Sequence, residues 1–359
     1  MRSLTVVTST TLALLSLSIA GTPGCSSVDG YGDGTGGTAP NPSGGSSNTS
    51  SGGASNTASG GASNNASGGA NNTASGGASN TASGGANNTA SGGAQSGGDD
   101  EVEPSSGCGQ AAPADGTASI DVDGLMREYI LALPENYDAE KAYKLIFTWH
   151  PWGGSAQQVA GNGPGGYYGL LGASEGEAIL VSPEGLDFGG NGLGWGNENG
   201  QDIAFLNAMM ERFDSELCFD HNRVFSTGFS FGGMMSNAVA CSGLARAVAP
   251  MAGNSSVSGC ENGAQPVAYM GFHGASDSVV AVSGGQAARD VFVERNGCGT
   301  ATASDSNWCE LAGANYQPCE CTTYEGCTEG YPVTWCEYNG DHMVAPNSGQ
   351  TIWDFFAQF

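Results

Sequence analysis

The stretch that decides the fold is Arg223 to Cys241, RVFSTGFSFGGMMSNAVAC, which places Ser230 between glycines. The residues before Ser230 are rich in β-forming side chains, and apolar residues after it recur at helical spacing. A serine nucleophile must stand on a sharp turn from strand to helix, where side chains at Gly228 and Gly232 would collide. We therefore expect Ser230 to be a nucleophile. The alternative is a glycine-rich turn without a chemical role.

Residues 1–25 have the pattern of an export signal, with Arg2 near the start and an apolar run too short to span a bilayer. The small residues before Cys25 resemble a bacterial lipoprotein cleavage site, so we expect Cys25 to be lipidated. Cleavage after Ala20 without a lipid is the alternative. The sequence has 11 cysteines, and setting Cys25 aside leaves an even number, as suits disulfides in an exported domain. We expect an extracellular or cell-surface protein that meets a membrane only through this anchor.

Residues 26–107 lack what a folded core needs. From Ser51 through Ala94 the unit SGGASNTA and its variants repeat, and no charged, aromatic or large aliphatic residue occurs between Gly34 and Gly98. Nothing in such a segment offsets the entropy lost on ordering. We expect a disordered, flexible tether with an r.m.s. reach of about 50 Å. A repetitive solenoid, the alternative, would need apolar positions.

Residues 108–359 have the length of a single α/β domain. The chain has 35 acidic and nine basic residues, so nucleic acid is not an expected partner, because phosphate binding needs clustered Lys and Arg. An acidic, solvated surface explains the charge better. The cluster CECTTYEGC, Cys319 to Cys327, is expected to form disulfides rather than a zinc site. We expect a monomer without metal or cofactor.

The domain alternates β-like and helix-like segments after an initial hairpin. This order predicts an α/β protein with a mostly parallel sheet and helices on both faces. Active residues of such sheets stand at the carboxyl ends of strands. The expected strands are TASIDV, REYILAL, KLIFTWH, AILVSPE, RVFSTG, RAVAPMAG, PVAYMGFHG and PVTWCEY, and the expected helices are DIAFLNAMMERF, AARDVFVERN and TIWDFFAQF.

Ser230 needs a base, and the four histidines differ in position. His342 follows the last expected strand in a loop that can reach over the sheet, whereas His221 precedes its strand at the opposite end. His150 opens the loop HPWGG and is expected to support it, and His273 is expected to pack beside the acid at position 277. We therefore expect His342 to be the general base and then the general acid.

Asp277 is expected to orient His342, because it follows a strand between Ser230 and His342, in the α/β-hydrolase order of serine, acid and histidine. Its alternative role is to cap the turn ASDS. Asp341 is a poorer choice, since sequence neighbours rarely align for such a contact.

Two backbone donors should stabilise the negative oxygen of a tetrahedral intermediate. The first expected donor is the N–H of Phe231, where the helix begins and its dipole assists. The second is the N–H of Trp152, in the loop PWGGS, whose glycines permit unusual φ angles.

From Cys108 onward the chain resembles the secreted feruloyl esterases of carbohydrate esterase family 1, which are related to acetylxylan esterases and polyhydroxybutyrate depolymerases. The stretches that carry the resemblance are REYILALPENYD, GQDIAFLNAMM, LCFDHNRVFSTGFSFGGMMSNAVAC, RAVAPMAG, FHGASDSVV, GYPVTWCEYNGDH and IWDFFAQF. The resemblance implies an α/β-hydrolase fold and a triad of Ser230, Asp277 and His342. Two departures are Pro151, where many relatives have glycine, and the cysteine-containing insert SNWCELAGANYQPCECTTYEGC.

The resemblance also implies hydrolysis of feruloyl esters of plant cell-wall polysaccharide. Acetylated xylan and hydroxyalkanoate polyesters are alternative substrates. A surface-tethered binding protein on an inactive hydrolase scaffold is an alternative of another class, against which the intact order of serine, acid and histidine counts. Aromatic residues expected near the site could stack on a feruloyl ring, with core packing as their alternative role: Trp149, Trp152, Tyr167, Tyr168 and Trp195.

Cys218 and Cys241 flank Ser230 at nearly equal distances along the chain. If the strand that leads to Ser230 and the helix that returns from it were equally long, both cysteines would lie at the same end of the sheet. We therefore expect a disulfide between Cys218 and Cys241 that braces the turn. The pairing of the other eight cysteines of the domain stays open.

Overall fold

The computed structural model describes residues 101–359, except positions 162, 188–189, 191, 258–264 and 305–306. The expected export signal, Cys25 and the glycine-rich repeats lie outside the described residues. No helix in the described part of the chain combines the length and the apolar character needed to cross a membrane.

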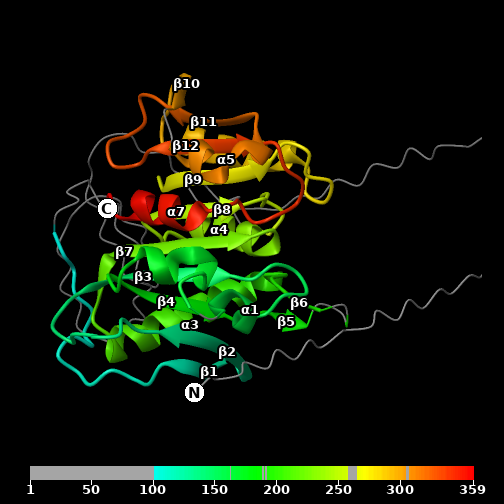
Figure 1. Ribbon diagram of the computed structural model, residues 1–359. Helices are drawn as coiled ribbons and strands as arrows, with labels where there is room; N and C mark the ends of the chain where they lie inside the picture. The colour runs from blue at the N-terminus through cyan, green and yellow to red at the C-terminus, as the bar shows by residue number, and fades with distance from the viewer. Residues whose placement is uncertain (1–100, 162, 188–189, 191, 258–264, 305–306) are drawn as a thin grey trace, which may run out of the picture. The chain divides into compact units, whose positions relative to one another are not determined.

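A sheet of ten strands forms the centre of the described domain, in the order β1-β2-β4-β3-β7-β8-β9-β12-β11-β10 (Figure 1). From β4 to β12 neighbouring strands run parallel, and antiparallel strands extend both edges. The strands are β1 Gly116–Val122, β2 Leu125–Ala132, β3 Tyr143–Trp149, β4 Ala178–Pro183, β7 Phe219–Phe229, β8 Ala247–Met251, β9 Ala268–Gly274, β10 Ala301–Ser304, β11 Cys319–Tyr324 and β12 Val333–Tyr338.

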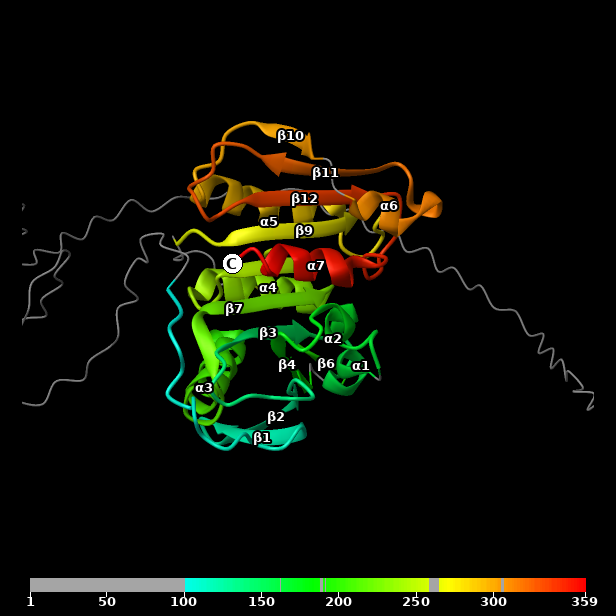
Figure 2. The same ribbon diagram turned by 60° about the vertical axis from the view of Figure 1, so that its left-hand side comes forward.

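Helices cover both faces of the sheet, as Figure 2 shows. On one face pack α3 (Gln201–Glu216), α4 (Phe231–Ser242) and α5 (Val282–Arg295); on the other lie α1 (Ala156–Ala160), α2 (Leu170–Ala173), α6 (Trp308–Ala312) and α7 (Ser348–Phe356). Each face has its own hydrophobic core, because side chains alternate along a strand: Phe147 of β3 joins the first core and Ile146 the second. Strands buried on both faces read as continuous apolar runs, which is why the sequence predicted them. The expected α/β-hydrolase fold is confirmed.

The edge formed by β10 and β11 was not predicted. These strands have little apolar alternation, so local sequence does not mark them. Three disulfides hold this edge and its surroundings, Cys298–Cys327, Cys309–Cys319 and Cys321–Cys336. The expectation that the cysteines of CECTTYEGC form disulfides is thus confirmed. A short hairpin of β5 (Leu186–Asp187) and β6 (Leu193–Gly194) was also missed.

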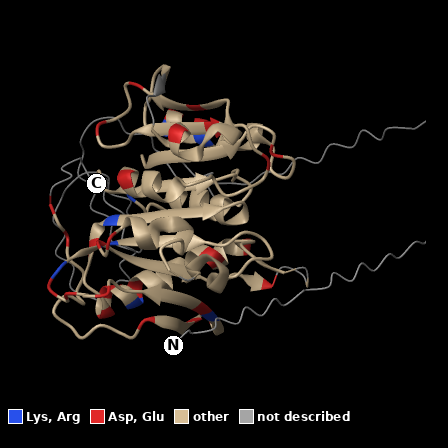
Figure 3. Ribbon diagram, viewed as in Figure 1, with Lys and Arg blue, Asp and Glu red and all other residues tan. Residues whose placement is uncertain are grey.

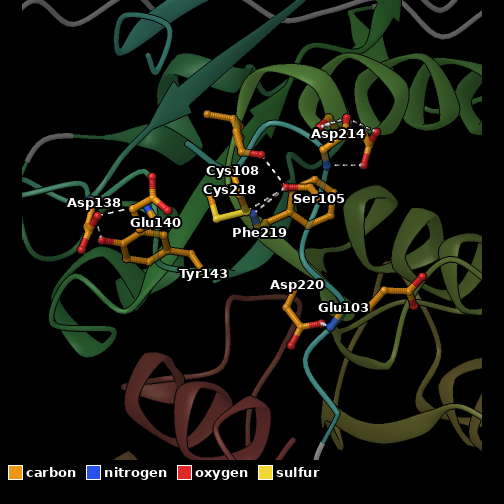
Figure 4. The surroundings of a disulfide bond; sticks show 12 residues. Glu103, Ser105, Cys108, Asp138, Glu140, Tyr143, Asp214, Cys218, Phe219 and Asp220 are labelled. Carbon is orange, nitrogen blue, oxygen red and sulfur yellow. Dashed lines mark hydrogen bonds between the residues drawn. A yellow bond between two sulfur atoms is a disulfide. The ribbon is translucent and has the colours of Figure 1, made fainter. Parts of the chain in front are cut away.

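The expected disulfide between Cys218 and Cys241 is wrong. Cys218 bonds to Cys108 (Figure 4). Cys241 is disulfide-bonded to a different cysteine. The reason is length: eleven residues of β7 extend about 36 Å, whereas the 12 residues of α4 extend only about 18 Å, so the helix does not return to the start of the strand.

The chain just before Cys108 lies along the amino end of β7, although the sequence assigned residues up to 107 to the tether. The N–H of Ser105 donates to the carbonyl oxygen of Phe219 at 2.8 Å, and Pro104 forms a β-bridge with Asp220. This segment brings Cys108 to Cys218 (Figure 4). The folded unit therefore begins a few residues earlier than composition indicates.

Acidic residues are spread over the loops and helices of the described domain rather than gathered in one cluster (Figure 3). Some carboxylates are buried instead, among them Asp202 at the start of α3, which is fully buried. Its Oδ1 accepts from Arg127 Nη2 at 2.9 Å, and its Oδ2 accepts from the Asn197 N–H at 2.7 Å. This ion pair anchors the segment between β6 and α3 to strand β2.

Candidate active site

Ser230 forms the sharp turn between β7 and α4. Its backbone has φ 57° and ψ −116°, a conformation that costs free energy for a residue with a side chain. The Ser230 N–H donates to the carbonyl oxygen of Met251 at 2.9 Å, which holds the turn against β8. A Cβ atom at Gly228 would strike the Gly232 carbonyl, and one at Gly232 would strike the carbonyl of Trp149. The collisions expected at both glycines are therefore present.

Three loops bring Ser230, His342 and Asp277 together at the carboxyl ends of β7, β12 and β9. Nε2 of His342 lies 2.7 Å from Oγ of Ser230, and Nδ1 of His342 lies 2.8 Å from Oδ2 of Asp277. The other oxygen of Asp277 accepts from the N–H groups of Val279 and Val280 at 2.9 and 2.7 Å. Because the carboxylate accepts the Nδ1 proton, Nε2 is left to accept the proton of Ser230.

Asp341 links the loop that carries Asp277 to the loop that carries His342. Its Oδ1 accepts from the N–H and the hydroxyl of Ser278 and from the N–H of His342, each at 2.8 Å. These hydrogen bonds hold the pKa of Asp341 below its usual range. Asp341 therefore contacts the backbone of His342 and leaves its ring to Asp277. Sequence analysis weighed Asp341 only as a triad member and missed this link, for which its adjacency to His342 was the only local signal.

The loop after β3 forms a tight turn from Pro151 to Gly154. The Gly154 N–H donates to the Pro151 carbonyl at 2.9 Å, and Gly153 adopts a positive φ of 69°, which a glycine tolerates at this turn position. The Gly153 N–H donates to Leu193 of β6 at 2.8 Å. Within the described part of the chain, the Trp152 N–H donates to no residue.

Trp152 and Phe231, the two expected backbone donors, approach each other at Gly194. A Cβ atom at Gly194 would lie 2.6 Å from Cε1 of Phe231 and 3.6 Å from Cδ1 of Trp152. Only a glycine leaves room there for both rings. The turn after β3 and the start of α4 are therefore adjacent, as an oxyanion site built from both requires.

His150 is fully buried and supports the turn, as expected from its position. Its Nε2 accepts from the Gly185 N–H at 2.9 Å, so its proton is on Nδ1, which lies 2.7 Å from the Pro151 carbonyl oxygen. The imidazole thus links the turn after β3 to the end of β4.

Comparisons with known proteins identify the family. No protein-family model matches the sequence. Among solved structures, the acetyl xylan esterase from Aspergillus awamori superposes with a TM-score of 0.49 at 16% identity, covering 67% of this chain and 98% of that one. Feruloyl esterase D of Neurospora crassa is 39% identical over 276 residues, which cover 71% of this chain and 91% of that protein. A probable feruloyl esterase C of Aspergillus terreus is 40% identical over 265 residues, 71% of this chain and 92% of that protein. The chain belongs to the feruloyl esterase family. It is a carboxylic ester hydrolase.

Beside its triad the esterase has a groove of about 660 Å³, between the α1–α2 region and the segment that leads into α7. Phe229 connects the groove to the triad, because its ring centroid lies 4.8 Å from that of His342. The wall combines apolar side chains with three amides. The wall includes Pro151, Val159, Tyr168, Phe229, Val344, Gln158, Asn347 and Gln350.

The aromatic residues of the esterase that were expected to bind substrate divide into two groups. Tyr168 lines the groove, and Trp152, in the turn after β3, is 58% exposed. Tyr167 and Trp195, in contrast, are buried at 2% and 0% exposure and pack in the core, which was their alternative role. Trp149 is buried as well. Trp149 is the last residue of β3, and Trp149 and Trp195 belong to one hydrophobic core whereas Tyr167 belongs to the other.

Among the residues that the structure describes, no group of three or more His, Cys, Asp or Glu side chains is arranged to hold a metal ion. The histidines and the acid nearest to Ser230 are instead engaged with one another and with backbone groups.

Proposed function

We propose that this protein is an exported serine esterase that hydrolyses feruloyl esters of plant cell-wall polysaccharide. The observation that carries the proposal is the continuous hydrogen-bonded series from Ser230 through His342 to Asp277, in a chain of the feruloyl esterase family. Ser230 is the nucleophile, His342 the general base and acid, and Asp277 the acid that orients it.

In the first half of the proposed reaction, Oγ of Ser230 attacks the ester carbonyl carbon while Nε2 of His342 takes the hydroxyl proton. Asp277 stabilises the imidazolium that forms and holds the tautomer that leaves Nε2 free. The carbonyl oxygen gains negative charge and is stabilised by the N–H groups of Phe231 and Trp152. His342 then donates its proton to the departing sugar oxygen, and a feruloyl group remains on Ser230.

In the second half a water molecule replaces the sugar. His342 accepts a proton from the water as the water attacks the feruloyl carbonyl carbon, and returns a proton to Oγ of Ser230 as the acyl bond breaks. Ferulic acid leaves, and the starting state of the triad is restored.

The groove supports an aromatic acyl group. Tyr168, Phe229 and Val344 line the groove, and the Phe229 ring packs against His342, so a planar ring can be buried there. Burial of a phenyl-sized group is worth about 2 to 3 kcal/mol. This corresponds to roughly 30- to 150-fold in rate when the ring is held in the transition state. An acetyl group gains almost none of this.

Export is supported by the disulfides, which persist in oxidising compartments. The signal-like residues 1–25 would direct the chain out of the cell, and a lipid on Cys25 would hold it at the surface through the glycine-rich tether. Mass spectrometry of the amino-terminal peptide tests this part of the proposal. A free amino terminus at residue 21 would favour release without a lipid.

The substrate is tested by measuring kcat/KM for methyl ferulate, acetylated xylan and a hydroxybutyrate oligomer in parallel. We expect methyl ferulate to be preferred. A preference for acetylated xylan would make the protein an acetylxylan esterase, and a preference for the oligomer would make it a polyester depolymerase. A fluorophosphonate probe tests the nucleophile, with Ser230→Ala as the control. Folded protein that stays unlabelled would favour a binding protein without esterase activity.

A further inference from the structure

Three consecutive carbonyl groups at the end of β3 each meet the polar atom of a side chain. Oη of Tyr168 donates to the Trp149 carbonyl at 2.7 Å, and Nε1 of Trp195 donates to the His150 carbonyl at 2.8 Å. Nδ1 of His150 lies 2.7 Å from the next carbonyl, that of Pro151. The carbonyl oxygens of Trp149, His150 and Pro151, which lead into the turn from Pro151 to Gly154 (the oxyanion turn), are therefore each held by a side chain.

The last of these contacts sets the direction of the Trp152 N–H. The Pro151 carbonyl and the Trp152 N–H belong to one trans peptide unit, so they point in opposite directions. His150 and the Gly154 N–H both engage the Pro151 oxygen, which fixes the plane of that peptide. The Trp152 N–H must therefore point away from His150 and Gly154.

The Tyr168 hydroxyl also links the two strands that carry the site. Besides its bond to Trp149 at the end of β3, it lies near the backbone of Phe229, the residue before Ser230. The Trp149 carbonyl in turn lies against Gly232 in the first turn of α4. The phenol thus lies where the strand that leads to the turn after β3 and the strand that leads to Ser230 both end.

Buried polar groups are usually hydrogen-bonded, so hydrogen bonds to three successive carbonyl groups would by themselves indicate only a well-formed core. The backbone of Tyr168 argues for a further role. Tyr168 and its neighbour Tyr167 adopt positive φ angles of 58° and 54°, a conformation that is unfavourable for residues other than glycine. This conformation delivers the Tyr168 hydroxyl to the ends of β3 and β7.

We propose that Tyr168, Trp195 and His150 are positioning residues that aim the Trp152 N–H at the negative oxygen of the tetrahedral intermediate. The inference rests on the proposed esterase function. The ring of Tyr168 lines the groove, whereas its hydroxyl donates to the Trp149 carbonyl, so removing the hydroxyl alone separates positioning from substrate contact.

The test compares Tyr168→Phe with the matched control Tyr167→Phe. Both variants keep the ring, and the Tyr167 hydroxyl donates no hydrogen bond within the described residues. We expect Tyr168→Phe to lower kcat on methyl ferulate about 10- to 100-fold with KM within about threefold, since loss of an oxyanion donor costs about 10²- to 10³-fold and a misaligned donor less. Tyr167→Phe should keep wild-type kcat.

An aryl boronic acid that forms a tetrahedral adduct with Ser230 supplies a second readout. Its affinity should fall by the same factor as kcat in Tyr168→Phe, while the affinity for ferulate should not change. Trp195→Phe, which removes the donor to His150, should show the same pattern. Unchanged kcat or boronate affinity in either folded variant would overturn the inference, as would a loss confined to KM or to the melting temperature. Full activity of Ser230→Ala would instead reject the proposed function itself.

Discussion

Nε2 of His273 lies 3.3 Å from Oδ2 of Asp277, the same carboxylate oxygen that receives Nδ1 of His342. His273 is fully buried, and its Nε2 also lies 2.8 Å from the Val280 carbonyl oxygen, so its proton is on Nε2. Its Nδ1 is buried without a hydrogen-bond partner in the described structure, facing Gly285 of α5. Burial lowers the pKa of His273, more than Val280 and Asp277 raise it. A neutral His273 can therefore support Asp277 without neutralising the charge that His342 needs.

The buried imidazole predicts that stability falls in mild acid. The pKa of His273 is lower in the folded protein than its ordinary value of about 6.5, so the unfolded chain binds this proton first as the pH falls. The contribution of neutral His273 to the free energy of unfolding should therefore be fully present above about pH 6.5. It should be lost as the pH falls from there toward the pKa of His273 in the folded protein. Urea unfolding between pH 8 and 5 measures this slope, and His273→Gln should flatten it. Equal slopes in the two proteins would contradict the assignment.

The link through Asp341 predicts a modest loss of activity when it is weakened. Asp341→Asn keeps the shape of the side chain but removes the charge that Ser278 and the His342 N–H share. We expect kcat to fall roughly 10-fold or less, because the triad loops become less well aligned. Asp277→Asn, measured beside it, should fall about 10⁴-fold, since the tautomer of His342 is lost. A loss in Asp341→Asn as large as that in Asp277→Asn would reverse the roles of the two acids.

The triad predicts a strong contrast among the histidines. Ser230→Ala and His342→Ala should each lower kcat by about 10⁵ to 10⁶ while the fold is kept. His221→Ala should be nearly silent, because His221 pairs with Asp214 at 2.7 Å near the amino end of β7, remote from Ser230. Kinetics on methyl ferulate with circular dichroism of each variant make the comparison. Retention of more than a few per cent of activity in Ser230→Ala would remove it from the mechanism.

The disulfide between Cys108 and Cys218 should contribute to stability rather than to catalysis. It joins residues 110 positions apart at the end of the sheet opposite Ser230. Replacing both cysteines by serine should lower the free energy of unfolding by up to about 5 kcal/mol, and the same change at Cys309 and Cys319, separated by 10 positions, by up to about 3 kcal/mol. Guanidinium unfolding measures both. Equal losses would show that loop entropy is not the main contribution.

Much of the architecture and the geometry around Ser230 could be predicted from the sequence because the signals are local. Glycines are required around Ser230 because a larger side chain would collide with the backbone of the same turn. The parallel strands can be recognised as apolar runs, because they are buried on both faces. The rule that functional residues follow parallel strands then led to Asp277 and His342, which the structure brings together with Ser230.

The tertiary structure alone decided features that depend on distances between remote segments. An extended strand is longer than a helix with a similar number of residues, so Cys241 does not return to Cys218. Cys218 pairs instead with Cys108, because the segment before Cys108 lies along β7. Tyr167 and Trp195 are core residues. Their burial could not be predicted, because a sequence does not show whether an aromatic side chain in a loop turns toward the sheet or toward solvent. The bonds of Tyr168 and Asp341 escape prediction for the same reason: a hydrogen bond needs its two atoms within about 3 Å, and only the packed chain sets that distance.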